Sequence, residues 1–463
     1  MTTEQAVRAP SAPVAAGSRA RHLIGMAADA PRFLQRLAAR HGPVVALRLG
    51  RGPVLLVTDP DATRAVLTDQ HGFPKGHGAG VAGGRPGDTP LRAVLGNGLL
   101  TSRGEHHRRQ RRLIQPAFHH RRIAAYGDVM ADEAVATASG WRDGGTVDLH
   151  GAFAETTLRI LTRTVFSVPV TGADAAMIRD TMNANMRGPG ANIVLVAFSR
   201  RLGMRAAGLR RAAMGGIDDM VASLIDERRA AADPGEDVLS WLIAARDDET
   251  GATMTDSDLR DEMLTLLLAG HETTTNALCW TYHLLAGHPE VAARLHAELD
   301  EVLDGGRPPT VEDLPRLNFT RAVVDESMRL YPPAWVMVRH AAQPTTLAGR
   351  DVPAGTTILL SPYVVHRDPG LWRDAGTFDP GRWLTGPAGE YQPVPESRHA
   401  FFPFGGGPRM CIGNTFALME IAMVLAATSR RWAMTPAPGH RVAMAPRVTL
   451  RPRGGMPMVV HAR

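Results

Sequence analysis

A chain of 463 residues, of which 44% are hydrophobic and 21% charged, is long enough to bury a large core and has the composition of a soluble globular protein. Two cysteines exclude a disulfide framework and favour a reducing, cytoplasmic setting. The N-terminus lacks an apolar run of membrane-anchor length. The net charge of +6 comes without a nucleic-acid-binding pattern, so we expect neither a membrane anchor nor a nucleic-acid partner.

Residues 1–20 are polar and rich in alanine and proline, so we expect a flexible N-terminal arm followed by a single domain over residues 21–463. Two runs within residues 40–70, "VVALRLG" and "PVLLVTD", are rich in β-branched residues and bounded by glycine and proline, which predicts short strands. Residues 74–90 are glycine-rich but lack the GK[ST] of a phosphate-binding loop. A surface loop and an access flap remain equally open interpretations of this stretch.

The strongest helix signal covers residues 255–287, within a region that reads mostly as helix. Thr255 and Asp258 suit a capping box, and Gly287 followed by Pro289 marks the end. The middle of this helix, "AGHETTT", holds a glycine, a charge and three threonines, all of which lower helix propensity. Because sequences depart from local preferences most often at functional sites, this segment is a candidate site.

Another helix is predicted over residues 316–330, where "YPP" ends it, and short strands with turns follow over residues 339–365. A last helix is predicted over residues 413–431, because its apolar residues recur on one face and its end is basic. Helices therefore dominate and strands cluster toward the two ends of the chain. This pattern predicts a mainly α fold with small β-sheets, of the α+β class.

Cys411 lies in the constrained stretch "FFPFGGGPRMCIG", residues 401–413. A lone cysteine is most often a buried core residue. A zinc or iron–sulfur site would need further cysteine or histidine ligands nearby, and the stretch has none. Its glycines allow tight turns whose amides can point at the sulfur, and a helix beginning near Gly413 offers its positive end. A thiolate that is the single protein ligand of a metal points to haem iron.

The motif FxxGxRxCxG resembles the haem-thiolate signature of the cytochrome P450 family, and the resemblance extends over residues 35–455. It implies the cytochrome P450 fold, a helix-rich triangular prism with a minor β-subdomain. It also implies heme b as the cofactor and Cys411 as the ligand of its iron. The other positions that match the motif, and that the resemblance assigns to cofactor binding, are Phe404, Gly407, Arg409 and Gly413.

Two further motifs support this resemblance. "ESMR" places Glu326 and Arg329 three residues apart on one helix face. In the family such a pair is joined by an arginine from a stretch like "FDPGRW", which here supplies Arg382. The resemblance implies a buried network of these three residues that is structural rather than catalytic.

The stretch "AGHETT" places Ala269, Gly270 and Thr273 close to one helix face, where small residues let a flat cofactor approach the backbone. Glu272 and Thr273 match the acid–alcohol pair that delivers protons during oxygen activation in the family. We expect a helix distortion here that holds a chain of water molecules. The alternative for Thr273 is a hydroxyl bonded to the carbonyl one helical turn earlier.

The resemblance also implies donors to the haem propionates. His107 takes a position that is often tryptophan in the family, and Arg111 follows four residues later. The donors assigned by this comparison are His107, Arg111, Arg339 and Arg409. The other arginines of the run at 106–112 either form a solvated face or attract an acidic electron donor.

The resemblance implies a substrate pocket lined by the 74–100 loop, Ala269, Thr273 and an apolar run whose alternative interpretation is ordinary core. The run consists of Trp335, Val336, Met337 and Val338. The stretch from His366 to residue 383 is similar to fatty-acid- and terpenoid-oxidising members rather than to those with asparagine at this position. We therefore expect a monomeric monooxygenase that hydroxylates or epoxidises a hydrophobic molecule, a terpenoid or polyketide before a fatty acid.

The chain ends soon after the haem domain, so we expect the electrons to come from a separate ferredoxin and its NAD(P)H-dependent reductase. The oxidant is expected to be O2. Two alternatives stay open. One is a haem-thiolate enzyme that uses peroxide or isomerises its substrate, against which Glu272 and Thr273 argue together. The other is a haem-binding sensor or carrier without catalysis, which would not need that pair.

Overall fold

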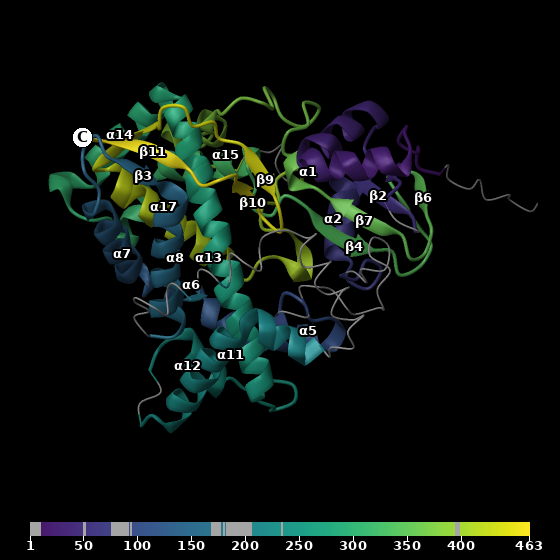
Figure 1. Ribbon diagram of the computed structural model, residues 1–463, viewed down its shortest axis with the longest axis horizontal. Coiled ribbons are helices and arrows are strands. Elements are labelled where there is room, and N and C mark those ends of the chain that lie inside the picture. The colour runs from purple at the N-terminus through teal and green to yellow at the C-terminus, as the bar shows by residue number, and fades with distance from the viewer. Residues whose placement is uncertain are drawn as a thin grey trace, which may run out of the picture. The chain divides into compact units, whose positions relative to one another are not determined.

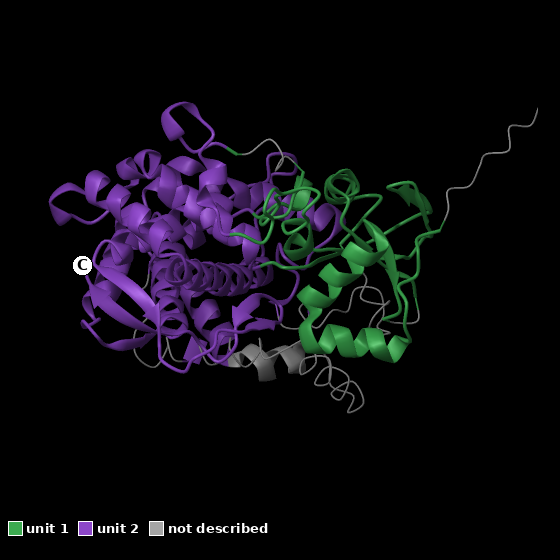
Figure 2. Cartoon of the chain, turned by 90° about the horizontal axis from the view of Figure 1, so that it is seen from above, with its two compact units in different colours: residues 1–89, 334–377, 393–411 green, residues 90–333, 378–392, 412–463 purple. Residues whose placement is uncertain are grey.

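The computed structural model describes residues 11–49, 52–75, 92, 95–167, 177–178, 181, 206–232, 235–393 and 399–463. Contacts divide the chain into two compact units, each assembled from three separate segments (Figure 2). Unit 1 comprises residues 1–89, 334–377 and 393–411, and unit 2 comprises residues 90–333, 378–392 and 412–463.

Unit 1 is built on a four-stranded sheet with strand order β1-β2-β7-β4. Strand β2 pairs in parallel with β7, and the other pairs are antiparallel. Its central strands β2 and β7 are buried along their whole length, as apolar β-branched runs predict. The strands of the unit are β1 (Val44–Leu47), β2 (Val54–Val57), β4 (Met337–His340), β5 (Thr345–Leu347), β6 (Arg350–Val352) and β7 (Thr357–Leu360).

The helical segments of unit 1 precede, separate or follow these strands along the chain. They are α1 (Arg19–His41), α2 (Pro60–Thr68), α16 (Pro362–Val365) and the 3-10 turn η7 (Gly407–Arg409). Helix α2 begins as its sequence requires, because the side chain of Asp59 caps it and Pro60 occupies its first turn. The turn η7 packs against α2, and this contact fixes one side of the loop that carries Cys411.

Unit 2 contains most of the helices (Figure 1). The longer ones are α5 (Gly104–Ile114), α7 (Gly127–Ser139), α8 (Leu149–Val165), α11 (Ala206–Ala230), α13 (Asp256–Gly287), α14 (Pro289–Val302), α15 (Asn318–Leu330) and α17 (Asn414–Ser429). The short ones are η1 (Gln115–Phe118), α6 (His120–Ala124), α12 (Val238–Ala244), η2 (Asp304–Gly306), η3 (Val311–Arg316), η4 (Pro380–Trp383) and η5 (Pro387–Gly389).

Helix α13 is the centre of unit 2. The Thr255–Asp258 capping box starts it and Pro289 opens the next helix, as predicted. It packs against α8, α11, α15 and α17. An apolar core joins its first half to α5, α8, α11 and α12, with Leu264, Leu267 and Leu161 among its buried members. Because the helix is packed on several sides, most of its side chains are buried.

Two small sheets complete unit 2. One has the order β3-β11-β8, from β3 (Thr146–Asp148), β8 (Trp432–Pro436) and β11 (Pro457–Ala462). The other pairs β9 (Met444–Pro446) with β10 (Leu450–Pro452). Strand β10 contacts α13, and Trp280 of α13 donates its indole N–H to the Leu450 carbonyl at 2.8 Å. The C-terminal strands are thereby fixed against the central helix.

The predicted fold class is confirmed, since helices dominate and the sheets are small. The strands within 40–70 are confirmed, and the helices near 255–287, 316–330 and 413–431 are confirmed with ends displaced by at most about two residues. Helix α1 begins at Arg19, inside the expected arm, of which residues 1–10 lie outside the described part of the chain. Most of the 74–90 stretch also lies outside it. No helix among the described residues combines the length and the apolar character needed to cross a membrane.

Candidate active site

Cys411 follows the turn η7 at the end of unit 1, and its side chain is exposed and not part of a disulfide. Its backbone N–H donates to the Phe404 carbonyl at 2.9 Å, and the N–H of Met410 donates to the Gly407 carbonyl at 3.0 Å. These bonds close the loop over residues 404–411 upon itself. The other cysteine, Cys279, is fully buried in α13, so Cys411 is the accessible thiol of the pair.

Gly407 is the position in this loop at which only glycine fits. Its φ of 62° lies in the left-handed region, which other residues adopt at an energetic penalty. A Cβ atom here would approach the Thr68 Cα to 2.8 Å and the Leu67 carbonyl oxygen more closely still. Backbone atoms cannot move aside as a flexible side chain would. Gly407 therefore lets the cysteine loop lie directly against the end of α2.

Arg339 is the second notable group of unit 1. Its side chain is 6% exposed, and its Nη1 donates to the Val338 carbonyl at 3.0 Å. Burial lowers the pKa of its guanidinium. Among the described residues no carboxylate lies within ion-pair distance of it. A buried cation without an acidic partner is costly, so this position suits an anionic group of a ligand. Arg409, in η7, is half-buried.

The apolar run before β4 divides into core and surface. Trp335 is buried, and its carbonyl accepts the Ser361 hydroxyl at 2.8 Å. Val336 and Met337 are half-buried, whereas Val338 is 40% exposed. Trp335 therefore behaves as a core residue of unit 1, and the other three leave apolar surface uncovered within that unit.

In unit 2, α13 has one open stretch in an otherwise buried span. Ala269 is exposed and Gly270 and Thr273 are half-buried, while residues 261–268 and 274–278 are buried. The Thr273 hydroxyl donates to the Ala269 carbonyl at 2.7 Å, which is the local bond considered as the alternative for this residue. The open stretch has the small side chains that a flat ligand requires.

The expected helix distortion at "AGHETT" is absent from α13, all of which is described and α-helical from Asp256 to Gly287. The hydroxyls of Thr273 and Thr275 bond to carbonyls four residues earlier and leave the backbone ladder intact. Gly270 also has a packing role, because a Cβ atom there would lie 3.0 Å from the Leu161 side chain of α8. The glycine thus permits a close approach of two helices.

Glu272 is buried and held by the C-terminal hairpin. Its Oε1 accepts the Thr449 hydroxyl at 2.6 Å, and Thr449 in turn accepts from Asn276 Nδ2 at 3.1 Å. Arg451 of β10 lies 3.8 Å from the same carboxylate oxygen. Burial raises the pKa of the Glu272 carboxyl, and the contacts with Thr449 and Arg451 oppose this shift. No local sequence motif points to these partners, which come from more than 170 positions away.

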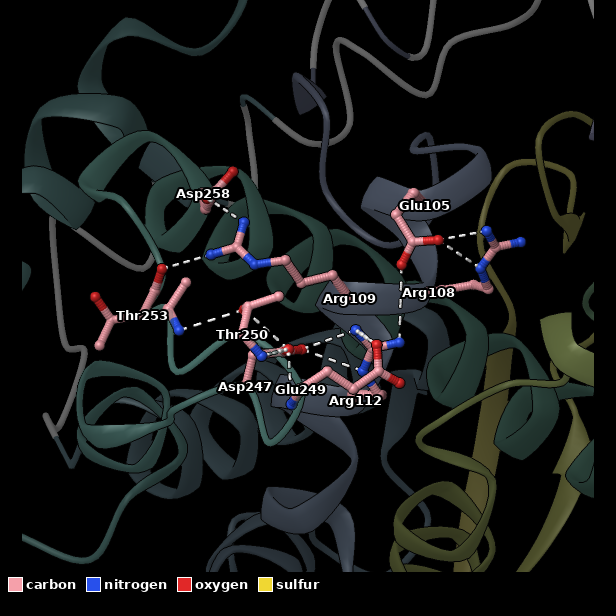
Figure 3. A network of polar contacts seen from close by, with 10 residues as sticks. Glu105, Arg108, Arg109, Arg112, Asp247, Glu249, Thr250, Thr253 and Asp258 are labelled. Carbon is pink, nitrogen blue, oxygen red and sulfur yellow. Dashed lines mark hydrogen bonds and ion pairs between the residues drawn. The ribbon is translucent and has the colours of Figure 1, made fainter.

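Most arginines of the basic run on helix α5 form ion pairs, which the sequence did not predict. His107 is buried and Arg111 half-buried, one turn apart on α5. The other arginines of the run pair with acidic groups of unit 2 (Figure 3). These ion pairs are Arg108 with Glu105, Arg109 with Asp258, and Arg112 with Asp247 and Glu249. Much of the positive charge of this helix is thus balanced within the unit.

Glu326, Arg329 and Arg382 meet in a buried network of unit 2. Arg329 Nε and Nη2 each donate to the Glu326 carboxylate at 2.8 Å, and Arg382 Nε donates at 3.0 Å. Both Glu326 and Arg329 are 0% exposed. The sequence did not identify Trp383, whose indole N–H also donates to Glu326 at 3.0 Å. A carboxylate with this many donors fixes η4 to α15.

These observations fit a haem with two propionates. Unit 1 supplies an exposed thiol and a buried arginine without a described carboxylate partner. Unit 2 supplies a stretch of small, exposed or half-buried residues between two buried stretches of α13, residues 261–268 and 274–278. Taken one by one, a thiolate can ligate haem iron, a buried cation can pair with a propionate, and small side chains on a helix let a flat group approach its backbone.

Comparisons with known proteins agree with this chemistry. Residues 22–456 match the family model of cytochrome P450. The chain is 41% identical over 420 residues to cyclooctat-9-en-7-ol 5-monooxygenase of Streptomyces melanosporofaciens, covering 88% of this chain and 86% of the relative. It is 38% identical over 406 residues to pentalenene oxygenase of Streptomyces avermitilis, covering 88% and 87%.

The fold is similar to the crystal structure of the cytochrome P450DA heme domain, with a TM-score of 0.84, 25% identity and 98% of each chain covered. A family match across almost the whole chain and two relatives above 30% identity agree with the thiol loop and the buried glutamate–arginine network. The chain belongs to the cytochrome P450 family and is a haem-thiolate monooxygenase.

Proposed function

We propose that this monooxygenase hydroxylates or epoxidises a terpenoid of specialised metabolism, with heme b as its cofactor and Cys411 as the iron ligand. The observation that carries the ligand assignment is the exposed thiol of Cys411 in the glycine-rich loop. The relatives support the substrate class, because they are named for oxidation of cyclooctat-9-en-7-ol and pentalenene. The apolar surface of Val336, Met337 and Val338 agrees with a hydrophobic substrate.

When bound, the haem supplies the oxygen chemistry, and the protein supplies charge balance, orientation and protons. Arg339 would compensate a propionate with its buried charge. We also assign propionate or haem contacts to His107, Arg111, Arg409, Phe404, Gly407, Gly413, Ala269 and Gly270. Glu326, Arg329 and Arg382 would act only by fixing η4 to α15.

Thr273 and Glu272 are the proposed catalytic pair. The hydroxyl proton of Thr273 is directed at the Ala269 carbonyl, so its oxygen remains able to accept a hydrogen bond. Burial raises the pKa of Glu272, so its carboxyl holds a proton closer to neutral pH than a solvated glutamate does. A carboxyl with this property is suited to act as a general acid.

Cys411→Ala and Cys279→Ala form a matched pair that tests ligation. Reduced, CO-treated wild-type protein and Cys279→Ala should show the red-shifted Soret band of thiolate-ligated haem, and folded Cys411→Ala should lack it. Retention of the band in Cys411→Ala would show that another residue ligates the iron. The second cysteine is an appropriate control because it is fully buried in α13.

The substrate class is tested by a spin-state titration with terpenoids, macrolactones and fatty acids. We expect terpenoids to shift the spin state at the lowest concentrations, and a stronger response to fatty acids would overturn the assignment. Turnover should require O2 and a separate ferredoxin with its NAD(P)H-dependent reductase. Turnover with peroxide but not with this system would identify a peroxide-using enzyme.

Three assignments complete the proposal. We expect a monomer in which residues 21–463 form one haem domain. We also propose a cytoplasmic location, supported by the fact that both cysteines are free thiols. Size-exclusion chromatography with light scattering tests the oligomeric state, and cell fractionation tests the location.

A further inference from the structure

His366 has no role in the chemistry proposed above, yet its side chain is completely buried in unit 1. It directly follows α16, and its backbone N–H donates to the Pro362 carbonyl at 2.8 Å. This bond fixes the backbone from which the imidazole extends. A buried imidazole must find a polar partner, because a buried ring nitrogen without a hydrogen bond is unfavourable.

That partner is the stretch that leads into the cysteine loop. The backbone N–H of Phe402 donates to His366 Nε2 at 3.0 Å, across 36 positions of sequence. The accepting nitrogen carries no hydrogen, so the ring is neutral with its hydrogen on Nδ1. The rings of Phe401 and Phe402 lie 5.1 and 5.2 Å from the imidazole centroid. Packing thus fixes the ring plane while the hydrogen bond fixes the backbone.

The contact continues through backbone bonds toward the thiol. The Phe402 carbonyl accepts the N–H of Gly405 at 2.9 Å, and the Phe404 carbonyl accepts the N–H of Cys411 at 2.9 Å. Gly407 lies against the end of α2 on the other side of the loop. The loop is therefore held within unit 1 at the His366 imidazole and against the backbone of α2.

We propose that His366 is a positioning residue for the iron ligand: by accepting the Phe402 N–H, its imidazole holds the loop so that the Cys411 thiolate is presented in one orientation. The proposal deepens the proposed function, because it rests on ligation by Cys411. In the sequence, His366 indicated only a class of substrate. The proposal instead gives it a role in holding the cysteine loop.

The test compares His366→Leu, which keeps similar volume but cannot accept a hydrogen bond, with His366→Gln, whose amide oxygen can reach the position of Nε2. His22→Leu is a matched control. His22 is also a buried histidine of unit 1 whose ring accepts a backbone N–H, from Arg48 at 3.0 Å, and it contacts Phe33. It does not touch the cysteine loop in the described structure.

The first measurement is the ratio of thiolate-ligated to unligated haem in the reduced, CO-bound spectrum. Loss of one net hydrogen bond should lower this ratio about fivefold in His366→Leu. The ratio should stay near the wild-type value in His366→Gln and His22→Leu. A ratio in His366→Leu within twofold of wild type, or no lower than in His22→Leu, overturns the proposal.

The second measurement uses haem-free protein and the rate at which the Cys411 thiol is alkylated, since Cys279 is buried and should not react. A freed loop should change this rate several-fold in His366→Leu only, and an unchanged rate counts against the proposal. If His366→Leu does not fold, His366→Asn replaces it, because its shorter amide does not reach Phe402. Equal ratios in the Asn and Gln variants then overturn the proposal.

These outcomes separate the proposal from the assignment beneath it. If wild-type protein lacks the red-shifted band, ligation by Cys411 fails. If wild-type protein shows the band and His366→Leu shows it equally, only the positioning role of His366 fails.

Discussion

The hydroxyl of Thr449 donates a 2.6 Å hydrogen bond to the carboxylate of Glu272, a residue 177 positions earlier in the chain. The bond is buried, and Arg451 lies beside the same oxygen. It joins the proposed proton donor to the C-terminal hairpin of unit 2. The environment of the acid therefore depends on residues that no local motif around "AGHETT" contains.

Thr449→Val should lower coupled turnover by about fivefold, because one net hydrogen bond contributes about 1 kcal/mol. The loss of a donor disfavours the ionised carboxylate, so the pKa of Glu272 should rise further. The limb of the pH–rate profile that reports this acid should therefore move to higher pH. Steady-state rates and peroxide release across pH measure both effects.

Thr281→Val is the control for that substitution. Thr281 is a buried threonine of α13 whose hydroxyl bonds only locally, to the Ala277 carbonyl at 2.8 Å. It should leave the pH profile in place. If both variants shift the profile equally, the effect comes from general loosening of α13 rather than from Glu272.

Glu326→Gln should destabilise the protein by about 3–5 kcal/mol, since it leaves buried guanidinium groups without their counter-charge. Glu105→Gln, which removes an exposed partner of Arg108, should change stability by about 0–1 kcal/mol. Denaturant unfolding of the two variants gives both values. Similar losses would show that the buried network does not hold unit 2 together.

Gly407→Ala should prevent the cysteine loop from reaching its position, because the new Cβ would meet backbone atoms of Leu67 and Thr68. The left-handed φ adds about 1 kcal/mol of strain. We expect poor haem incorporation and a small red-shifted Soret fraction. Gly376→Ala, where a Cβ atom meets nothing within 4 Å, should incorporate haem normally. Normal spectra for Gly407→Ala would contradict the steric argument.

Glu420→Gln should change how stability depends on pH. Glu420 is buried in α17, and burial raises its pKa from 4.5 to about 8. The folded protein thus retains a proton that the unfolded chain releases above about pH 4.5. Its contribution to stability is complete below pH 4.5 and declines as pH rises to about 8.

Because glutamine resembles the protonated acid, Glu420→Gln should match wild type at pH 4.5 and exceed its stability by about 1 kcal/mol or more at pH 8. Thermal unfolding at several pH values measures the difference. Glu301→Gln, at an exposed position of α14, should follow the wild-type curve. Parallel curves for wild type and Glu420→Gln would mean that Glu420 is ionised in the folded protein.

Local signals predicted the helices well. The capping box at Thr255 and the proline at 289 defined α13 within one residue, because caps act through neighbouring backbone groups. The distortion expected at "AGHETT" was wrong because threonine hydroxyls can satisfy local carbonyls without breaking the helix. Propensity alone does not distinguish these outcomes.

Contacts between residues far apart in the chain could not be predicted from the sequence. The arginines of α5 were visible as a basic run, but their acidic partners at Asp247 and Glu249 lie on a segment 135 or more positions away. The hydrogen bond from Trp383 to Glu326 was likewise not predicted from the sequence. Side chains that meet only through the tertiary fold have no fixed separation in the sequence, so no motif reveals them. Glu326 and Arg329 could be paired from the sequence because they lie within one helical turn.

The Glu326 network also has a consequence for biosynthesis. Its donors at Asp379, Arg382 and Trp383 follow Glu326 by 53 to 57 positions, and the intervening residues 334–377 belong to unit 1. Closing so long a loop carries an entropic penalty that a buried carboxylate with several donors can offset. Unit 2 also needs residues 412–463. A ribosome-bound chain therefore cannot complete either unit early, and nascent molecules should remain protease-sensitive until translation is almost finished.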